Sequence, residues 1–479
     1  MIENSITPRA VVIDDIDAGR ELTSIALESS QIGFKVDSYD SYYSYETWQK
    51  SNPSEKVDLF LLDYKMPRID GLKAAELISK IYPNTQKILT TDHKEVVEKI
   101  DLPNIDKLVY KHINFSEYQK GMYSVVSEMI RERKIVQHYN IGVIGVGKLG
   151  DRSIKFSQDL PYIDKIFIYS RHGNDEKREQ FEDAMRNSQM HQTEKLVFCH
   201  SLESIIDKKP NILLGTSGKY GFNSSDFGSG KENMIPSYDT NFEFSQEIFY
   251  TLEKRGFEGM YVCETTPPEL LIAYGRKIYR GGILTSWAAD TIRARAHFIK
   301  DWQKRVTEEG YGEVRQDNID ISVIGTHRWS IPLLNKSCRI KGFKLEDVLP
   351  EFKDHNFAVK YADRLKRKMT KQADKSIEAG RELSAFHRDT SIAMRECLEN
   401  IAYLKRCPNS SWVCEVSIDG IEGYILAPAI IDYRNCRLIK NFNPDELDES
   451  TREKIKKQLL WQNKIVRNRF EQMKLTKSN

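Results

Sequence analysis

Acidic side chains stand at the ends of two apolar runs near the start of the chain. Asp14 and Asp15 follow AVVI, and Asp63 follows LFLL. Because the carboxyl ends of parallel strands meet at one edge of a sheet, these acids are expected to lie together. Clustered carboxylates repel one another unless a cation joins them, and Mg²⁺ takes one or two carboxylates together with water and phosphate oxygens. The sequence therefore predicts a Mg²⁺ site at Asp14, Asp15 and Asp63.

Two later strand ends add a hydroxyl and a cation to the same edge. Thr91 (or its neighbour Thr90) ends KILTT, and Lys111 ends VYK. A single Asp after a strand is most often a helix N-cap, but capping does not account for the whole set of strand-end groups. With VVIDD, LFLLDYKMPRIDG, KILTT and VYK, residues 8–135 resemble a response-regulator receiver domain. One departure is His112, which follows the lysine where that family usually has Pro.

The receiver resemblance implies a phosphorylation switch. Asp63 would be the phosphoacceptor, Asp14 and Asp15 would join it in holding Mg²⁺, and Thr91 and Lys111 would contact the phosphoryl group. As a nucleophile Asp63 forms an acyl phosphate, and Mg²⁺ offsets the charge on the transferred group. The new dianion then draws the hydroxyl and the ammonium toward it. The implied partner is a sensor histidine kinase or a phosphotransfer protein.

A glycine-rich loop begins a second unit. Residues 141–150 read IGVIGVGKLG, with G-x-G-x-x-G directly after an apolar strand and at the start of a helix-like stretch. A second strand follows at 165–170, which gives the βαβ context that a dinucleotide fingerprint requires; a chance cluster of glycines is the alternative. The expected cofactor-binding residues in and near this loop are Gly145, Gly147, Lys148, Leu149, Gly150 and, after a later strand, Thr216.

The end of the strand at 165–170 bears on the choice of cofactor. It reads IYSRHG and carries no acid that would accept from a ribose 2′-hydroxyl. Ser170 and Arg171 stand there instead, and a guanidinium suits a 2′-phosphate. We therefore expect NADP in preference to NAD, with an Arg171 that only faces solvent as the alternative.

An acid, a cation and a histidine follow in the last third of the chain. Asp290 and Arg293 are three residues apart in SWAADTIRARAHF, so on a helix they share a face. His327 ends an apolar run in ISVIGTHRWSIPLL. Taken separately, the pair is equally well an ordinary ion pair and the histidine equally well a capping or core residue.

Together with the glycine loop, these segments make residues 140–475 resemble the lactate/malate dehydrogenase family. The matching text is GTHRWSIP, AADTIRARA and RDTSIAMRECLENI. The resemblance implies that His327 exchanges a proton, Asp290 orients it, Arg293 binds a substrate carboxylate and Thr390 lines the substrate pocket. A nicotinamide would supply or take the hydride, while the His–Asp pair moves the alcohol proton.

Two segments depart from the dehydrogenase pattern. Residues 219–241, where the family has a mobile loop with a catalytic Arg, contain no Arg at all. Lys231 is the cation near the middle of this stretch, and we expect it to act on the substrate oxygen, although a lysine does not reproduce a planar guanidinium. Thr266 before Pro267 replaces the family's Asn and is expected on the substrate side.

The elements that would position these residues form an α/β chain of three parts. Residues 8–135 are expected to be a flavodoxin-like (βα)5 receiver, 140–285 a Rossmann NAD(P)-binding domain, and 286–475 an α+β dehydrogenase-like substrate domain. In the last part we expect a hairpin around Asp419-Gly420. Helices are expected over 288–308, 346–375, 384–405 and 444–473.

Composition limits the function classes. The chain has 479 residues and 40% apolar side chains, and 72 basic against 70 acidic residues give a net charge of +2, so no global field favours nucleic acid or membrane. Seven scattered Cys without a C-x-x-C pair indicate reduced thiols in a cytoplasmic protein, and we see no secretory signal and no transmembrane run. The family resemblance also implies a homo-oligomer.

Two functions remain open from the sequence. The first is a phosphorylation-regulated, NAD(P)-dependent dehydrogenase for a small 2-hydroxy/2-oxo acid. The second is a non-catalytic NADP(H)-binding sensor that has lost turnover, a possibility raised by the missing Arg and Asn. A DNA-binding output is not expected, because the chain has no helix-turn-helix unit and no basic domain.

Overall fold

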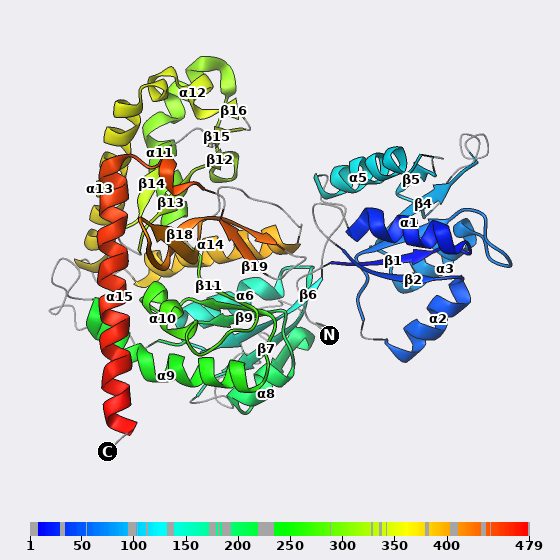
Figure 1. The fold of residues 1–479 in the computed structure, drawn as a ribbon, viewed down its shortest axis with the longest axis horizontal. Coiled ribbons are helices and arrows are strands. Elements are labelled where there is room, and N and C mark those ends of the chain that lie inside the picture. Colours follow the sequence, from blue (N-terminus) through cyan, green and yellow to red (C-terminus); the bar gives the residue numbers. More distant parts are fainter. Residues whose placement is uncertain are drawn as a thin grey trace.

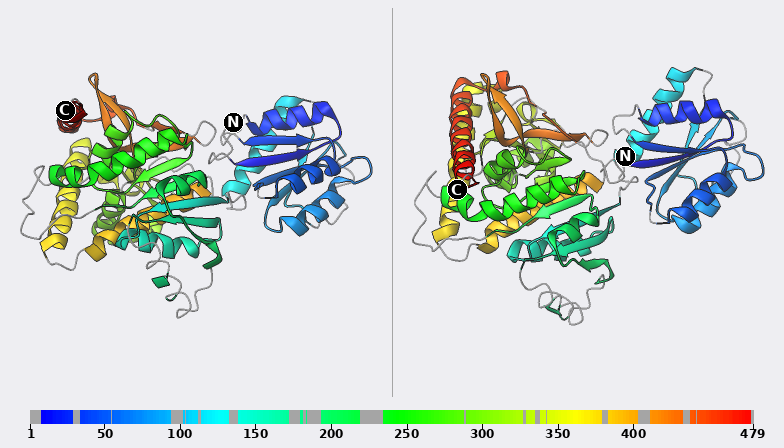
Figure 2. Two further views of the ribbon diagram at one scale, coloured as in Figure 1. Left: turned by 90° about the horizontal axis from the view of Figure 1, so that it is seen from below. Right: turned by 60° about the horizontal axis from the view of Figure 1, so that its bottom comes forward.

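The computed structural model describes most of the chain. The described residues are 8–28, 34–53, 55–93, 102, 104–111, 114–131, 138–171, 179–180, 183, 193–218, 234–287, 289–326, 329–334, 338–341, 343–378, 383–402, 411–432, 437–440 and 442–477. Figure 1 shows two groups of elements, one from the blue-to-cyan start of the chain and a larger one from residue 138 onward. The same grouping is visible in both views of Figure 2.

The first group is a five-stranded parallel sheet with the order β2-β1-β3-β4-β5. Its strands are β1 (Arg9–Ile13), β2 (Lys35–Tyr39), β3 (Leu59–Asp63), β4 (Gln86–Thr91) and β5 (Lys107–Tyr110). Its described helices are α1 (Asp17–Glu28), α2 (Tyr42–Ser51), α3 (Gly71–Ile81) and α5 (Phe115–Arg131). This strand order is that of the flavodoxin-like fold, so the expected receiver architecture is confirmed.

Alternating residues of these strands cover two separate cores. Val11, Phe60 and Leu89 pack with residues of α2 and α3. Their neighbours Val12 and Leu61 pack on the other face with residues of α1 and α5. A strand that is buried on both faces has a continuous run of apolar residues. For this reason β1, β3 and β4 can be recognised in the sequence. The edge strand β2, KVDSY, is half polar and does not stand out in this way.

The second group contains a six-stranded parallel sheet with the order β11-β10-β9-β6-β7-β8. Its strands are β6 (Tyr139–Ile144), β7 (Ile163–Tyr169), β8 (Leu196–Phe198), β9 (Ile212–Gly215), β10 (Met260–Cys263) and β11 (Ile283–Thr285). The helices between them are α6 (Lys148–Gln158), α8 (Leu202–Asp207), α9 (Met234–Lys254) and α10 (Pro268–Gly275). This is a Rossmann-type sheet, as the sequence predicts.

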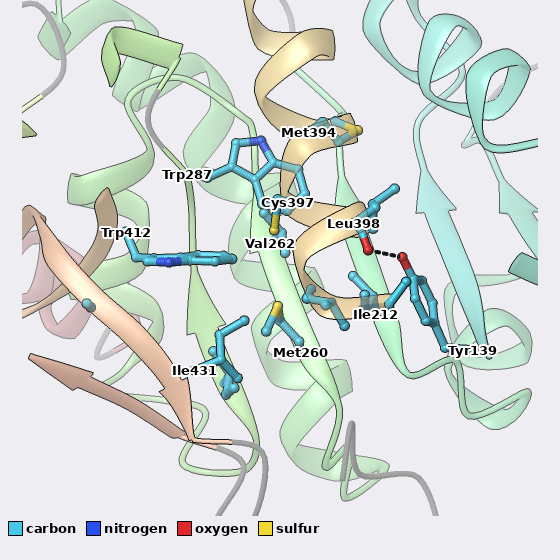
Figure 3. Close-up of a cluster of buried hydrophobic side chains, with 14 of the residues drawn as sticks. Tyr139, Ile212, Met260, Val262, Trp287, Met394, Cys397, Leu398, Trp412 and Ile431 are labelled. Carbon is cyan, nitrogen blue, oxygen red and sulfur yellow. Dashed lines mark hydrogen bonds between the residues drawn. The ribbon is translucent and has the colours of Figure 1, made fainter. Parts of the chain in front are cut away.

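A helix from the last third of the chain covers one face of this sheet. Figure 3 shows α14 (Leu383–Ala402), which carries Met394 and Leu398, packed beside Met260 and Val262 of β10. The Tyr139 hydroxyl at the start of β6 donates to the Leu398 carbonyl oxygen at 2.7 Å. The parts expected as 140–285 and 286–475 therefore share one hydrophobic core.

The remaining elements form small antiparallel sheets among long helices. The described strands are β12 (Ile319–Asp320), β13 (Ser322–Ile324), β14 (Ile331–Leu333), β15 (Arg339–Ile340), β16 (Phe343–Lys344), β17 (Ser411–Ile418), β18 (Ile421–Asp432) and β19 (Arg437–Lys440). The expected hairpin is confirmed: β17 pairs with β18, and Asp419 (φ 52°) and Gly420 (φ 76°) both take the left-handed conformation of a type I′ turn.

Two of the expected helices need correction. The stretch expected as 346–375 is divided into α12 (Leu345–Val348) and α13 (His355–Glu378). Pro350 lies between them; it lacks an N–H and keeps the preceding residue out of the helical conformation. The last helix, α15, is Glu449–Lys477 and does not begin at Pro444, which starts a separate 3₁₀ turn ending at Glu446. The helix expected over 288–308 is α11 (Ala289–Val306).

Candidate functional site

The three predicted acids meet at the carboxyl edge of the receiver sheet. Asp14 follows β1, and Asp63 is the last residue of β3. The carboxylate oxygens of Asp14, Asp15 and Asp63 lie within 4.8 Å of one another. Asp14 and Asp63 are buried and Asp15 is exposed, so a cation would be bound with one side open to water. Oxygen donors in this arrangement fit Mg²⁺, which usually keeps several water ligands.

Lys111 joins two of these carboxylates. Its ammonium nitrogen lies 2.6 Å from Asp14 Oδ2 and 2.5 Å from Asp63 Oδ1. Burial raises the pKa of Asp63, and the Asp14 charge adds to this effect while Lys111 opposes it. Burial alone would lower the pKa of Lys111, but its two carboxylate partners raise it. The predicted phosphoacceptor therefore has a fixed cation beside it.

Thr91 ends β4 at the same edge and is buried. Its hydroxyl oxygen accepts from the His93 N–H at 3.0 Å. His112 lies outside the described residues, so the structure does not describe the chain at the departure from the receiver pattern. All three acids, Thr91 and Lys111 thus lie at or just beyond the ends of strands β1, β3, β4 and β5.

The turn that follows Asp63 requires particular residues at positions 70 and 71. Asp70 caps α3 by accepting from the Lys73 N–H at 2.8 Å. A Cβ on Gly71 would lie only 2.3 Å from the Asp63 carbonyl oxygen, so a side chain there would displace the backbone of the phosphoacceptor. Glycine at this position lets α3 begin directly against the end of β3.

The glycine loop has the geometry of a dinucleotide fingerprint. Gly145 has φ +99°, which permits the turn between β6 and α6. A Cβ on Gly150 would lie 1.9 Å from the Gly145 carbonyl oxygen, so glycine is needed for close packing of the helix on the strand. In contrast, no atom of the described residues lies within 4 Å of the place that a Cβ on Gly147 would take. The loop therefore leaves open space where a pyrophosphate would approach the start of α6, next to Leu149.

Thr216 forms hydrogen bonds with the backbone of the glycine loop. Its hydroxyl donates to the Gly145 carbonyl oxygen at 2.7 Å and is near the Ile144 carbonyl oxygen at 3.1 Å. The sequence predicts that Thr216 binds the cofactor, and its described contacts are with the backbone of the loop. The side chain of Lys148 lies outside the described residues.

Arg171 stands after β7, close to Ser170, where the adenosine half of a dinucleotide would lie. Its guanidinium pairs with Glu247 of α9 and lies over the Phe244 ring, 4.3 Å from the ring centroid. Arg171 is about half exposed. A 2′-phosphate would therefore compete with Glu247 for the Arg171 guanidinium. The sequence pattern does not reveal that Glu247 is a partner of Arg171.

The predicted Asp–Arg pair is present and buried. Arg293 Nη1 donates to Asp290 Oδ1 at 2.7 Å on the first turns of α11. The Ser330 hydroxyl, from the segment that precedes β14, donates to Asp290 Oδ2 at 2.7 Å. Thr390 of α14 is buried as well. The GTHRWSIP segment is thus tied to Asp290 through Ser330, while His327 itself lies outside the described residues.

The predicted loop is partly helical. Residues 219–233, including Lys231, lie outside the described residues, but 234–241 belong to α9 and not to a loop. Pro236 is close to the start of this helix, where its missing N–H has no cost. On the same helix, the buried Asn241 donates from Nδ2 to the Thr266 carbonyl oxygen at 2.8 Å. An amide therefore lies beside Thr266, contributed by another element.

Glu264 is a residue that the motifs do not identify. It directly follows β10, and its carboxyl oxygen accepts from the Ser286 hydroxyl at 3.1 Å. Burial raises its pKa to about 8, against the opposing effect of its hydrogen bonds with Ser286 and the Trp287 backbone. An acid immediately after the buried strand MYVC is the signal that could have drawn attention to it.

Comparisons with known proteins agree with both parts of the fold. Residues 10–121 match the family model of the response regulator receiver domain. No curated protein matches the chain. Among solved structures, malate dehydrogenase from Plasmodium falciparum is similar with a TM-score of 0.52 at 14% identity, covering 69% of this chain and 98% of that one.

Two lactate dehydrogenases are similar to the same extent. The enzyme MGS-M5 from a Medee basin deep-sea metagenome library has a TM-score of 0.53 at 12% identity and covers 69% of this chain and 98% of its own. The Eimeria maxima enzyme, solved with NADH and oxamate, has a TM-score of 0.53 at 14% identity and covers 71% and 97%. Residues 10–121 are therefore a response regulator receiver domain, and the larger part of the chain has the lactate/malate dehydrogenase fold.

Among the described residues, no helix combines the length and the apolar character needed to span a bilayer.

Proposed function

We propose that this chain is a response regulator whose receiver is phosphorylated on Asp63 and controls a nicotinamide-dependent output. The observation that carries the proposal is the contact of Asp63 with Lys111 beside Asp14 and Asp15, in a chain that continues into a Rossmann sheet. Mg²⁺ held by the three acids would offset the charge on an incoming phosphoryl group. Asp63 supplies the nucleophilic oxygen, and Lys111 holds it in place.

The output is proposed to be an oxidoreductase for a small 2-hydroxy/2-oxo acid. A nicotinamide cofactor would supply or accept the hydride. The backbone of Gly145, Gly147 and Gly150 would hold its pyrophosphate at the start of α6. Asp290 orients the proton-exchanging His327, and Arg293 binds the substrate carboxylate. In this proposal Lys231 acts on the reacting oxygen, and Thr266 and Thr390 contact the substrate.

The proposed function also implies partners, an oligomeric state and a compartment for the protein. The partner of the receiver is a sensor histidine kinase or a phosphotransfer protein, and the dehydrogenase-like part forms a homo-oligomer. The described cysteines at 199, 263, 338, 397 and 414 are buried and form no disulfide with one another, which suits a reducing cytoplasm. The boundaries 8–135, 140–285 and 286–475 stay predictions.

A second candidate is a cofactor-binding sensor without turnover. The observation that favours it is the environment of Asp290, whose two oxygens accept from Arg293 and from Ser330. An arginine held in this way is partly neutralised before any substrate arrives. NADP(H) binding would then be read out by the receiver or by a partner.

One set of experiments separates the two. A small acyl-phosphate donor with Mg²⁺ should label the full-length protein, and Asp63→Asn should abolish labelling, whereas Glu76→Gln at a partly exposed position of α3 should leave it intact. NADPH consumption is then measured with a panel of 2-oxo acids. Slow turnover that His327→Asn abolishes while cofactor binding persists supports the enzyme. Binding of NADP(H) without any turnover across the panel supports the sensor. Equal labelling of the Asp63→Asn variant contradicts the receiver assignment.

A further inference from the structure

Glu264 lies at the carboxyl edge of the Rossmann sheet, between the ends of two strands. Its backbone N–H donates to the Gly215 carbonyl oxygen at 2.9 Å, and this contact continues the pairing of β10 with β9. Its side chain accepts from the hydroxyl of Ser286, the residue after β11. The carboxyl group is therefore held at the edge where ligands of open α/β sheets bind.

The surroundings of Glu264 contain little that would stabilise a negative charge. Tyr261 and Cys263 on β10 are completely buried, and Glu269 on α10 is 1% exposed. The charge of Glu269 also acts on Glu264, and because Glu269 is itself acidic, it raises the pKa of Glu264 further. Among the described residues, no lysine, arginine or histidine pairs with the Glu264 carboxyl. The Ser286 hydroxyl and the Trp287 N–H are its stabilising partners.

Contacts connect this segment with the dinucleotide loop. The Thr265 hydroxyl, next to Glu264, donates to the Ser217 carbonyl oxygen. The Ser217 hydroxyl in turn donates to the Ile144 carbonyl oxygen at 2.9 Å, directly before Gly145. In the strand order, β7 with Arg171 lies on one side of the loop, and β9 and β10 lie on the other. A dinucleotide with its adenosine half near β7 extends its nicotinamide half over the ends of β9 and β10.

We propose that Glu264 is a proton-linked residue that distinguishes the oxidised from the reduced nicotinamide cofactor. This inference rests on the proposed function, because it requires a cofactor at the glycine loop. The oxidised nicotinamide ring carries a positive charge and the reduced ring carries none. Next to a reduced ring, Glu264 keeps its proton. Next to an oxidised ring, it gives the proton to solvent, and its carboxylate then attracts the ring in surroundings of low polarity.

The proton of the Glu264 carboxyl group leaves by a defined path. When oxidised cofactor binds below pH 8, the Glu264 O–H bond breaks, the electron pair stays on the carboxylate and the proton leaves to water. No electron is transferred in this step. Binding of the reduced cofactor releases no proton. The preference for oxidised over reduced cofactor therefore increases with pH until Glu264 is ionised in every state.

The test measures cofactor binding and does not depend on turnover. Dissociation constants for NADP⁺ and NADPH are measured by calorimetry between pH 6.5 and 9.5 on the full-length protein. We expect the ratio of the NADPH to the NADP⁺ dissociation constant to rise by about tenfold across this range, which corresponds to a shift of one pKa unit on binding. In Glu264→Gln, which keeps an acceptor for Ser286, the ratio should not change with pH. Glu258→Gln, an exposed residue before β10, is the matched control and should behave like the unmutated protein.

A direct proton measurement accompanies the titrations. In weakly buffered solution at pH 7.5, an indicator dye should report proton release on addition of NADP⁺ and none on addition of NADPH. The measurement is repeated on His327→Asn, because His327 is the other group at the cofactor that could release a proton. Release that persists in His327→Asn assigns the proton to Glu264 even if Glu264→Gln does not fold, and release that disappears there contradicts the proposal. If both cofactors bind with a ratio that is flat in pH, or if Glu264→Gln keeps the slope, Glu264 does not have this role. If neither cofactor binds, the cofactor part of the proposed function fails, and this inference fails with it.

Discussion

The ammonium group of Lys56, in the receiver part, lies 3.2 Å from Asp164 Oδ1 on β7 of the Rossmann sheet. The same oxygen is 3.3 Å from Nδ1 of His138, directly before β6. Burial alone would raise the pKa of Asp164, but His138 and Lys56 together hold it below its ordinary range. The two parts of the chain, separate in Figure 2, are thus joined by a charged contact at this point.

A double-mutant cycle tests whether this contact exists in solution. Lys56→Met and Asp164→Asn, singly and together, should show a coupling free energy of about 0.2–1 kcal/mol, because the pair is partly exposed. Thermal unfolding of the full-length variants at low salt provides the measurement. The coupling should shrink at high salt, where exposed charges are screened. Strictly additive effects at low salt would show that the pair does not form.

The buried carboxyl group of Asp58 should make the free energy of unfolding depend on pH. It is buried, accepts from the Arg9 N–H at 2.7 Å, and burial raises its pKa to about 6. The folded chain therefore holds a proton here that the unfolded chain releases near pH 4, so this group lowers stability as the pH rises from about 4 to about 6. Asp58→Asn keeps an acceptor and cannot ionise.

We expect Asp58→Asn to be more stable than the unmutated protein at pH 7.5, by about 1–3 kcal/mol, and to lose most of this advantage at pH 4.5. Thermal midpoints at the two pH values provide the measurement. The exposed Asp40→Asn is the control for loss of a carboxylate elsewhere in the receiver. A difference in midpoint that is the same at both pH values would show that Asp58 ionises as an ordinary carboxylate.

The two glycines of the loop predict different defects. Gly150→Ala should destabilise the protein by about 1–3 kcal/mol, because its Cβ would meet the Gly145 carbonyl oxygen at 1.9 Å. Gly147→Ala should destabilise the protein less than Gly150→Ala, because no atom of the described residues lies within 4 Å of its Cβ, and yet it should weaken NADPH binding at least tenfold. Thermal melts and cofactor titrations separate the two effects. Wild-type affinity in Gly147→Ala would mean that no pyrophosphate approaches this glycine.

Cofactor choice depends on Arg171 and its partner Glu247. If Arg171 binds a 2′-phosphate, NADPH should bind about ten- to a hundredfold more tightly than NADH, and Arg171→Ala should abolish this preference. Glu247→Gln removes the competing carboxylate and should increase the preference. Titrations of the three proteins with both cofactors provide the measurement. Preference for NADH by the unmutated protein would rule out this role of Arg171.

The sequence predicts those contacts that residue spacing within one sheet, helix or βαβ unit determines. Asp14 and Asp63 can be placed together because each ends a buried strand of one parallel sheet, and Asp290 with Arg293 because a helix sets their spacing. The glycine loop is legible because Gly145 and Gly150 meet steric requirements within one βαβ unit.

Contacts between distant segments could not be predicted in this way. Glu247 reaches Arg171 from a helix 76 residues away. Asn241 reaches Thr266 from α9, part of which the sequence presents as a loop with Pro236 near its start. The raised pKa of Glu264 comes from burial that only the packed sheet produces. In each case tertiary packing, and not residue spacing, creates the environment.

Phosphorylation of Asp63 is proposed to control nicotinamide-dependent turnover. Its most direct test is the rate of NADPH consumption with a panel of 2-oxo acids, measured with and without a small acyl-phosphate donor and Mg²⁺. We expect slow turnover in the unmutated protein, with a rate that changes on addition of the donor. In Asp63→Asn the donor should have no effect, although NADPH still binds. An identical rate with and without the donor, in a protein shown to be labelled on Asp63, would rule out control of turnover by the receiver.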